Sequence, residues 1–317
     1  MTNPRSLDNE SDEPLISEKR EAKLYGGQAI LEGVMMKGAT KAVASVRNPD
    51  GQIVSKTLSE WPEKVNKGFR QYPFIRGMFT LWESLSLGMT ALRYSAEVAM
   101  PDEEGKPSNP IVENLMFGVS IILAVGLFLV LPTKLPVWLG FKKMGFGSLE
   151  LNLIEGVIKI MVFIGYIMAI SLMKDIRRVF QYHGAEHKTV NAYEAKVPLN
   201  VENVQKFPTA HYRCGTSFLF IVVIVHILLV VPFGFAESLL TRTIIRLATL
   251  LPVASISYEI LRFSAAHKSH FLCRLLFAPG LLFQKLTALE PDDSMVEVAI
   301  DAFSKVIPED DPTLISA

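Results

Sequence analysis

The sequence is poor in cysteine and has no excess of either charge. Only two cysteines, Cys214 and Cys273, occur in 317 residues, which excludes a disulfide framework and any metal site built from four cysteines. The 32 basic and 32 acidic residues balance, and no long basic block occurs, so no nucleic-acid partner is expected. The glycine-rich stretch 25–38 lacks the spacing of a phosphate-binding or dinucleotide-binding loop, which argues against nucleotide binding there.

The first hundred residues are charged and mixed in composition. Residues 1–23 are polar, lack the apolar core of a signal peptide, and are predicted to be a disordered tail. Residues 24–105 are predicted to be a cytoplasmic α+β region. It would contain a β-hairpin over 42–58, turned at Asn-Pro-Asp-Gly, and an amphipathic helix over 74–100. Such a helix suits a membrane surface or the side of a helix bundle.

Long apolar runs begin after residue 110. A helix needs about 20 mostly apolar residues to cross a bilayer, and four runs meet that length: 111–131, 153–173, 217–235 and 244–263. Four buried helices of a large soluble core are the alternative, but runs this long are rare in soluble proteins. The predicted fold is mainly α, a polytopic membrane protein with about four transmembrane helices in region 106–270 and a small cytoplasmic α+β N-terminal region.

The distribution of positive charge predicts the orientation of these helices. The loop 174–216 is rich in lysine and arginine, whereas the short turn after the third run has neither. Because basic loops stay on the cytoplasmic side, this loop and both termini are predicted to be cytoplasmic, in a multi-pass protein of the inner or cytoplasmic membrane. Three lysines in the first outer loop (134, 142 and 143) argue mildly the other way.

Residues 271–317 are predicted to form an interfacial segment followed by a cytoplasmic helix. The apolar segment 271–286 is too short to span a bilayer, and we expect Pro279-Gly280 to break it into a hairpin. The following helix has Asp292 or Asp293 as its natural N-cap.

The stretch "YHGAEHKT", residues 182–189, carries the strongest chemical signal. On a helix, His183 and His187 lie four residues apart and face the same side, with Glu186 on a neighbouring flank. This His-x-x-Glu-His order is the inverse of a zinc-protease motif. The two imidazoles would hold a divalent metal, with zinc expected, and Glu186 would be the general base. Glu259, near the cytoplasmic end of the fourth run, is the predicted third ligand.

Other interpretations of the same residues stay open. His211 and Cys214 are rival ligands, and with the first two histidines they could close a structural four-ligand site. Cys214 could instead act as a nucleophile with a histidine base, or be a small buried residue at a helix start. The histidine pair could also lie in an ordinary polar loop and bond to backbone carbonyls.

Two features of the predicted spans concern polar side chains. Glu155 and Lys159 are spaced to form an ion pair. Arg242 and Arg246 are expected to extend toward the outer interface.

Five motifs give the chain a resemblance to a known family: "GGQAILEGVMMKG", "PFIRG", "YHGAEHKTVNAYE", "RCGTSFLF" and "LEPDDSMVEVAIDAF". In this order they resemble the YqhQ-like bacterial membrane proteins, the domain of unknown function 1385. The resemblance covers residues 23–303. It implies an integral membrane protein that has been described as a predicted metal-dependent enzyme, and it places the metal on His183, Glu186 and His187.

Three functions are therefore considered. The first is a membrane-embedded metal-dependent hydrolase, with a peptidase as one form, acting at the cytoplasmic face on a protein or peptide. The second is a non-enzymatic scaffold or assembly factor with a structural metal or hydrogen-bond site, and the third is a transporter, for which no repeat or charged pathway is visible. The lipid bilayer is the expected surrounding. Because four helices are few to enclose a site, a homo-oligomer is a further expectation.

Overall fold

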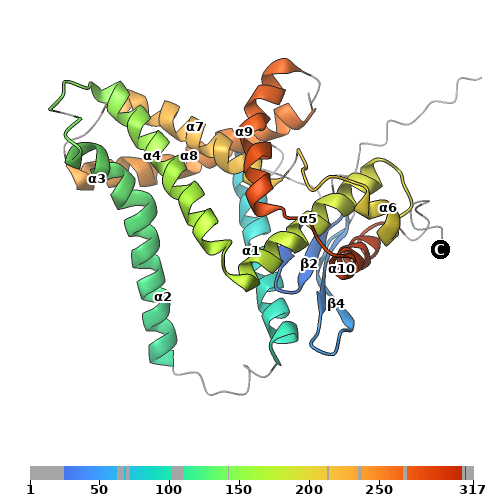
Figure 1. Cartoon of the computed structure of the whole chain (residues 1–317). Helices are drawn as coiled ribbons and strands as arrows, with labels where there is room; N and C mark the ends of the chain where they lie inside the picture. The colour runs from blue at the N-terminus through green and yellow to red at the C-terminus, as the bar shows by residue number, and fades with distance from the viewer. Residues whose placement is uncertain are drawn as a thin grey trace, which may run out of the picture.

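The structure is a computed structural model that describes residues 25–62, 68, 72–101, 110–141, 143–212, 214–234, 238–266, 270–308 and 311. The tail predicted over 1–23 lies outside these residues. Figure 1 shows two parts, a small sheet packed with helices and a group of apolar helices.

An antiparallel meander of four strands forms the sheet, in the order β1-β2-β3-β4. The strands are β1 (Gly26–Ile30), β2 (Gly33–Lys37), β3 (Lys41–Arg47) and β4 (Ile53–Glu60). The β3–β4 turn confirms the predicted hairpin. Gly51 has a φ of 83°, which glycine adopts without a Cβ clash, and Asn48 Oδ1 accepts a 2.8 Å hydrogen bond from the Gln52 amide.

Helices cover both faces of this sheet (Figure 1). On one face, α5 (Lys174–Glu194) and α10 (Asp293–Ser304) join a core that includes Val34, Met36 and Phe303. On the other, α1 (Ile75–Ala99) packs against Ile30 and Val46. One face of the N-terminal sheet is therefore buried by segments more than a hundred residues away in the chain, and the other by the nearby helix α1.

The predicted amphipathic helix is confirmed as α1, which packs on its neighbours and also exposes apolar side chains. Gly77 lies against α8, where a Cβ would come within 2.9 Å of the Tyr258 Cβ. Away from these contacts, Trp82 is 74 % exposed and Leu85 is 63 % exposed. The exposed apolar side of α1 suits a membrane surface.

The apolar part consists of helices from the middle of the chain: α2 (Pro110–Val125), the π-helical η3 (Gly126–Val130), α3 (Leu131–Trp138), α4 (Ser148–Ile170), α7 (Gly215–Val230), η4 (Val231–Phe233), α8 (Leu239–Ala266) and α9 (Phe271–Thr287). Three segments are long and apolar enough to cross a membrane, Gly118–Trp138, Ser148–Ile170 and Leu240–Ser264. The third predicted span corresponds to Phe218–Phe233, a shorter apolar helix.

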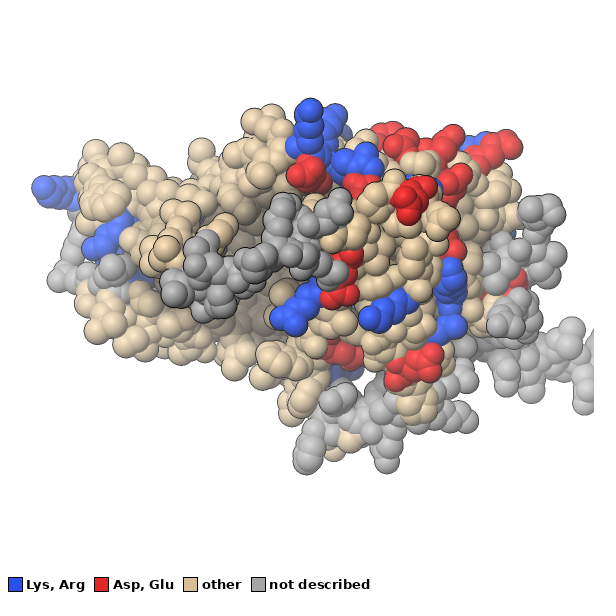
Figure 2. All heavy atoms as spheres, turned by 90° about the horizontal axis from the view of Figure 1, so that it is seen from below, with Lys and Arg blue, Asp and Glu red and all other residues tan. Residues whose placement is uncertain are grey.

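These helices expose most of their apolar surface. Only 11 % of the residues in each of the first two spans are buried, and 28 % in the last. In Figure 2 charged side chains gather over the half that holds the sheet and α10, while the half that holds α2 is largely uncharged. Exposed apolar surface of this extent is typical of a membrane or protein interaction surface.

Two local predictions are wrong. The helix α9 runs from Phe271 to Thr287 through Pro279 without a break. Buried Phe277 and Phe283 fix the helix on both sides of the proline, and this packing compensates for the hydrogen bond that proline removes. Arg242 and Arg246 do not extend outward as predicted either, because they are 8 % and 4 % exposed. Arg242 donates to Thr133 O, and Arg246 is paired with Glu155.

The start of α10 confirms the predicted cap. The Asp292 carboxylate accepts a 3.0 Å hydrogen bond from the Met295 amide, which makes Asp292 the N-cap.

Candidate metal centre

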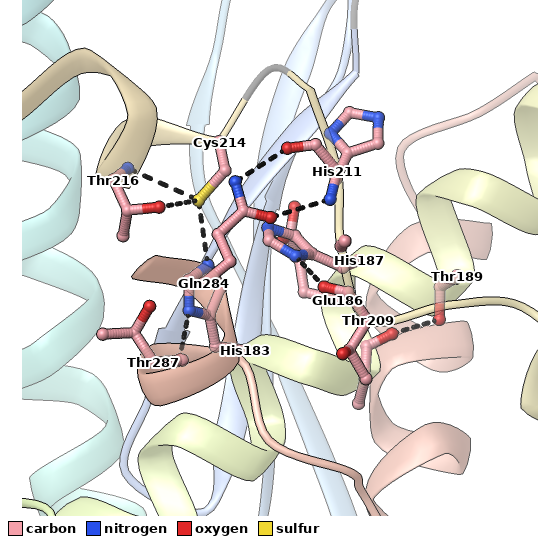
Figure 3. A network of polar contacts seen from close by, with 12 residues as sticks. His183, Glu186, His187, Thr189, Thr209, His211, Cys214, Thr216, Gln284 and Thr287 are labelled. Carbon is pink, nitrogen blue, oxygen red and sulfur yellow. Dashed lines mark hydrogen bonds and ion pairs between the residues drawn. The ribbon is translucent and has the colours of Figure 1, made fainter. Parts of the chain in front are cut away.

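Helix α5 carries the histidine motif and is distinct from the second span. The span ends at Ile170, Met173 is extended, and α5 begins at Lys174. On α5, His183 and His187 face the same side, as their spacing predicts, with ring centroids 4.4 Å apart. They are joined by Cys214, and one ligating atom from each of the three lies within 4.8 Å of the others. Figure 3 shows these side chains converging.

Backbone carbonyls fix the orientation of both imidazoles. His183 Nδ1 lies 2.7 Å from Thr287 O, and His187 Nδ1 bonds to Thr209 O. A carbonyl oxygen can only accept, so each Nδ1 carries the proton. In a neutral ring, Nε2 then presents its lone pair. Metal-ligating histidines are commonly held in this way by a second hydrogen bond.

Cys214 supplies the third donor atom. It is the N-cap of α7, and its Sγ accepts a 3.4 Å hydrogen bond from the Thr216 amide. The same sulfur lies 3.2 Å from His183 Nε2. Without a metal, the thiol can donate its proton to that nitrogen, a geometry shared with cysteine–histidine nucleophile pairs. Cys214 is 8 % exposed, however, so a substrate has little access to the sulfur.

Glu186 lies at the edge of the donor group. One carboxylate oxygen is 3.5 Å from His187 Nε2. With Nδ1 protonated, a neutral His187 turns a lone pair toward this oxygen, and two acceptors at this distance repel each other. A proton or a metal cation beside them removes the repulsion. Glu186 is 5 % exposed, so water screens this interaction little.

A close approach between backbones holds the segment after α9 against α5. A Cβ at Gly184 would lie 1.9 Å from Leu289 O. The absence of that Cβ lets the chain after α9 cross α5, where the Leu289 amide bonds to Phe180 O at 2.9 Å. This crossing places Thr287 O beside His183.

A second set of contacts holds the loop that leads into α7. Asn191 Nδ2 donates to Pro208 O at 2.9 Å and to Ala210 O at 3.1 Å. Buried Lys188 donates to Gln205 O at 2.8 Å. These bonds keep the loop along α5 and thus keep the Thr209 carbonyl at His187.

Two of the predicted ligands lie elsewhere. The Glu259 carboxylate pairs with the Arg76 guanidinium and accepts a 3.1 Å hydrogen bond from the Phe74 amide. Because these partners occupy it, Glu259 is removed from the proposed ligand set. The His211 backbone is clamped by Gln284 through bonds of 2.8 and 2.9 Å.

The ring of His211 is directed away from the sulfur of Cys214, as Figure 3 shows. Its Nε2 lies 3.5 Å from Glu194 Oε1, and its centroid is 5.7 Å from that of His187. His211 therefore does not complete a four-ligand site in this arrangement.

Sequence reasoning missed a group of residues behind the centre. Glu32, in the β1–β2 turn with a φ of 49°, pairs with Arg178 and accepts a 3.3 Å hydrogen bond from Tyr182. Burial and the nearby Glu32 carboxylate raise the pKa of the Tyr182 phenol. A Cβ at Gly27 would come within 2.8 Å of the Glu186 Cγ. The unusual "GGQAILEG" stretch was the available signal, since it holds both Gly27 and Glu32.

Comparison with known proteins gives the family of the chain. A family model described as "Protein of unknown function (DUF1385)" matches residues 72–309. The chain belongs to this family. It is 36 % identical over 298 residues to the "Uncharacterized protein YqhQ" of Bacillus subtilis (strain 168), covering 89 % of this chain and 92 % of that protein. No solved structure matches the chain. The family resemblance seen in the motifs is thereby confirmed, while the DUF1385 description assigns no activity.

The donor atoms fit a divalent transition metal. Two imidazole nitrogens and one thiolate are ligands that zinc binds in proteins. Three protein ligands leave a coordination position open, as in catalytic zinc sites, unless Glu186 fills it. The two carbonyl-held imidazoles need no reorientation to offer their lone pairs.

Proposed function

We propose that this DUF1385 protein is an integral membrane protein with a metal-dependent hydrolase centre made of His183, His187 and Cys214, with Glu186 as general base. The observation that carries this proposal is the convergence of three donor atoms within 4.8 Å, with both imidazoles oriented by carbonyls. A protein or peptide is the proposed substrate, because the His-x-x-Glu-His order is shared with metallopeptidases.

The three apolar spans support placement in a membrane, and α7 would be a fourth, short crossing. With 16 residues, α7 is near the lower limit of a spanning helix. The basic loop 174–216 supports a cytoplasmic position for the metal centre and both termini. A homo-oligomer stays a prediction.

The chain's own groups have distinct roles in the proposed reaction. A bound divalent metal would supply Lewis acidity toward a water molecule or a carbonyl oxygen. Thr287 O and Thr209 O hold the protons on Nδ1, so that each Nε2 can offer its lone pair to a metal. Glu186 accepts a proton at its carboxylate, 3.5 Å from His187 Nε2, and can return it to a leaving group.

Metal analysis of purified protein tests the centre directly. Wild type should carry about one zinc per chain, and C214S and the double variant H183A/H187A should lose it. E259Q is the matched control. It removes the carboxylate that was predicted from the sequence as the third ligand. Because that carboxylate lies outside the donor group, the variant should keep the metal. Zinc-free wild type, or full zinc in the double variant, would refute the site.

Activity is tested with fluorescent casein and a panel of short peptides. E186Q should retain zinc but lose hydrolysis, and chelation should abolish hydrolysis by wild type. Activity that survives chelation and is lost in C214S would instead assign a cysteine nucleophile.

A second candidate is a structural metal site in a membrane scaffold. The burial of the centre favours it, because His187 is 1 % exposed and Glu186 is 5 % exposed. The site also ties α5 to the start of α7. If E186Q keeps its zinc and fully complements a deletion strain, while C214S unfolds, the scaffold is the correct function.

A further inference from the structure

A second polar cluster lies among the apolar helices, away from the metal centre. Glu155 and Lys159 are on α4 and Arg246 is on α8. Glu155 and Arg246 are 2 % and 4 % exposed. Ionisable groups in such a setting are costly and are usually functional.

The cluster contains more positive than negative charge. Glu155 Oε2 accepts a hydrogen bond from Arg246 Nη2, and Glu155 Oε1 lies 2.9 Å from Lys159 Nζ. Thr133 Oγ1 also approaches Oε1, at 3.3 Å. One carboxylate thus faces two cations, which leaves one positive charge uncompensated within this trio.

Within the described residues, two of the donor nitrogens of Arg246 are unsatisfied. Its Nε and Nη1 atoms are buried and have no acceptor among the described residues. Buried guanidinium groups ordinarily have their N–H groups satisfied, since leaving them unpaired in an apolar setting is unfavourable. The unmatched charge and the unpaired donors are separate observations, and both call for an anion with several acceptor atoms.

The position of the cluster indicates which kind of anion would bind there. Arg242, one turn before Arg246, donates from Nη1 to Thr133 O at 3.1 Å and so joins the start of α8 to α3. In Figure 1, α3 and the start of α4 lie at the end of the apolar helices remote from α5. In a bilayer this end would be near the lipid headgroups. A phosphodiester there carries a single negative charge and non-bridging oxygens that accept from arginine and lysine.

We propose that Arg246 and Lys159 bind a singly charged phosphate group between α3, α4 and α8, supplied by the headgroup of an anionic phospholipid. The phosphate oxygens accept from Arg246 Nε and Nη1, and the added charge balances the trio. The inference uses the placement of the helices in a membrane but is independent of the metal centre.

The test uses the full chain, purified and delipidated in detergent, and follows its thermal unfolding midpoint. Short-chain phosphatidylglycerol should raise the midpoint, whereas diacylglycerol with the same acyl chains should not. Inorganic phosphate is the second arm. A rise with phosphate alone keeps the phosphate site but assigns a soluble source, which overturns the lipid assignment.

Variants test whether the phosphatidylglycerol shift arises at Arg246. R246Q leaves Glu155 and Lys159 as a balanced pair and should lose the phosphatidylglycerol shift. R246K keeps the charge but lacks the Nε and Nη1 donors. Because it loses at least one hydrogen bond between charged groups, it should bind phosphatidylglycerol at least about tenfold more weakly. K143Q removes an exposed lysine from the loop before α4 and should keep the full shift.

Three results would overturn the proposal. They are no shift with either phosphate compound, an equal shift with chloride at matched ionic strength, or an unchanged shift in both R246K and R246Q. If R246Q does not fold, R246K and the chloride comparison still decide the question.

Discussion

Replacing Gly184 with alanine tests how the metal centre is assembled. In an exposed helix, this change would stabilise the protein by about 1 kcal/mol through helix propensity. Here the added Cβ would lie 1.9 Å from Leu289 O, so the segment after α9 must move. Overpacking of this kind costs about 1–3 kcal/mol.

Movement of that segment also breaks specific bonds. The bond between the Leu289 amide and Phe180 O and that between His183 Nδ1 and Thr287 O measure 2.9 and 2.7 Å. Each is worth about 0.5–1.5 kcal/mol. Set against the propensity gain, G184A should lower the free energy of unfolding by about 1–5 kcal/mol. Release of His183 should also weaken zinc binding by about 10–100-fold, as for other residues that orient ligands.

Thermal unfolding in detergent, followed by circular dichroism, and zinc titration measure the two effects. G165A is the matched control: it makes the same change in helix α4, where a Cβ would have no neighbour within 4 Å, and it should lose neither stability nor zinc affinity. If G184A unfolds at the wild-type temperature and binds zinc as tightly, the close crossing of α5 does not build the centre.

Three further predictions concern α10 and the core beneath it. D292A removes the N-cap and should cost about 1 kcal/mol, whereas D293A, which removes no cap, should cost less; equal losses would contradict the assigned cap. Burial alone would raise the pKa of Asp301, but hydrogen bonds from Lys305 and two serines outweigh it and leave that pKa below its usual value. The ionised Asp301 therefore adds stability above the unfolded-state pKa of about 3.9, and that stability is lost as the pH falls through the lower folded-state pKa. D301N should show a smaller acid destabilisation than wild type in unfolding experiments between neutral pH and about pH 3. F303A empties a fully buried position and should cost about 3–5 kcal/mol, so a loss below about 1 kcal/mol, typical of an exposed side chain, would show that α10 does not close the core.

Features with a short-range cause were predictable. The hairpin follows from the turn residues around Gly51, the N-cap of α10 from Asp292, and the pairing of Glu155 with Lys159 from helical spacing. The apolar helices follow from composition and length, because a run of apolar residues longer than the lower limit for a span has few alternatives in water. The facing of His183 and His187 follows from the helix period.

The errors share one cause, which is pairing between distant segments. Glu259 was assigned to the metal because it is acidic and predicted to lie at the correct membrane face, but α1 brings Arg76 to it from 183 residues away. Arg246 was expected to extend outward, whereas it pairs with Glu155, which comes from α4. Local sequence does not encode which of several acids or bases a folded chain brings together.

The sequence by itself determined the apolar helices, the β3–β4 turn, the N-cap of α10 and the orientation of two histidines on one helical face. These depend on interactions within a few residues, which pattern and residue type specify. Only the tertiary structure decided that Cys214 joins the histidines, that Glu259 does not, and that Arg246 keeps unpaired donors beside Glu155. Those outcomes depend on close crossings, such as that of Gly184 with Leu289 O, where the missing volume of one side chain sets the position of segments far apart in the chain.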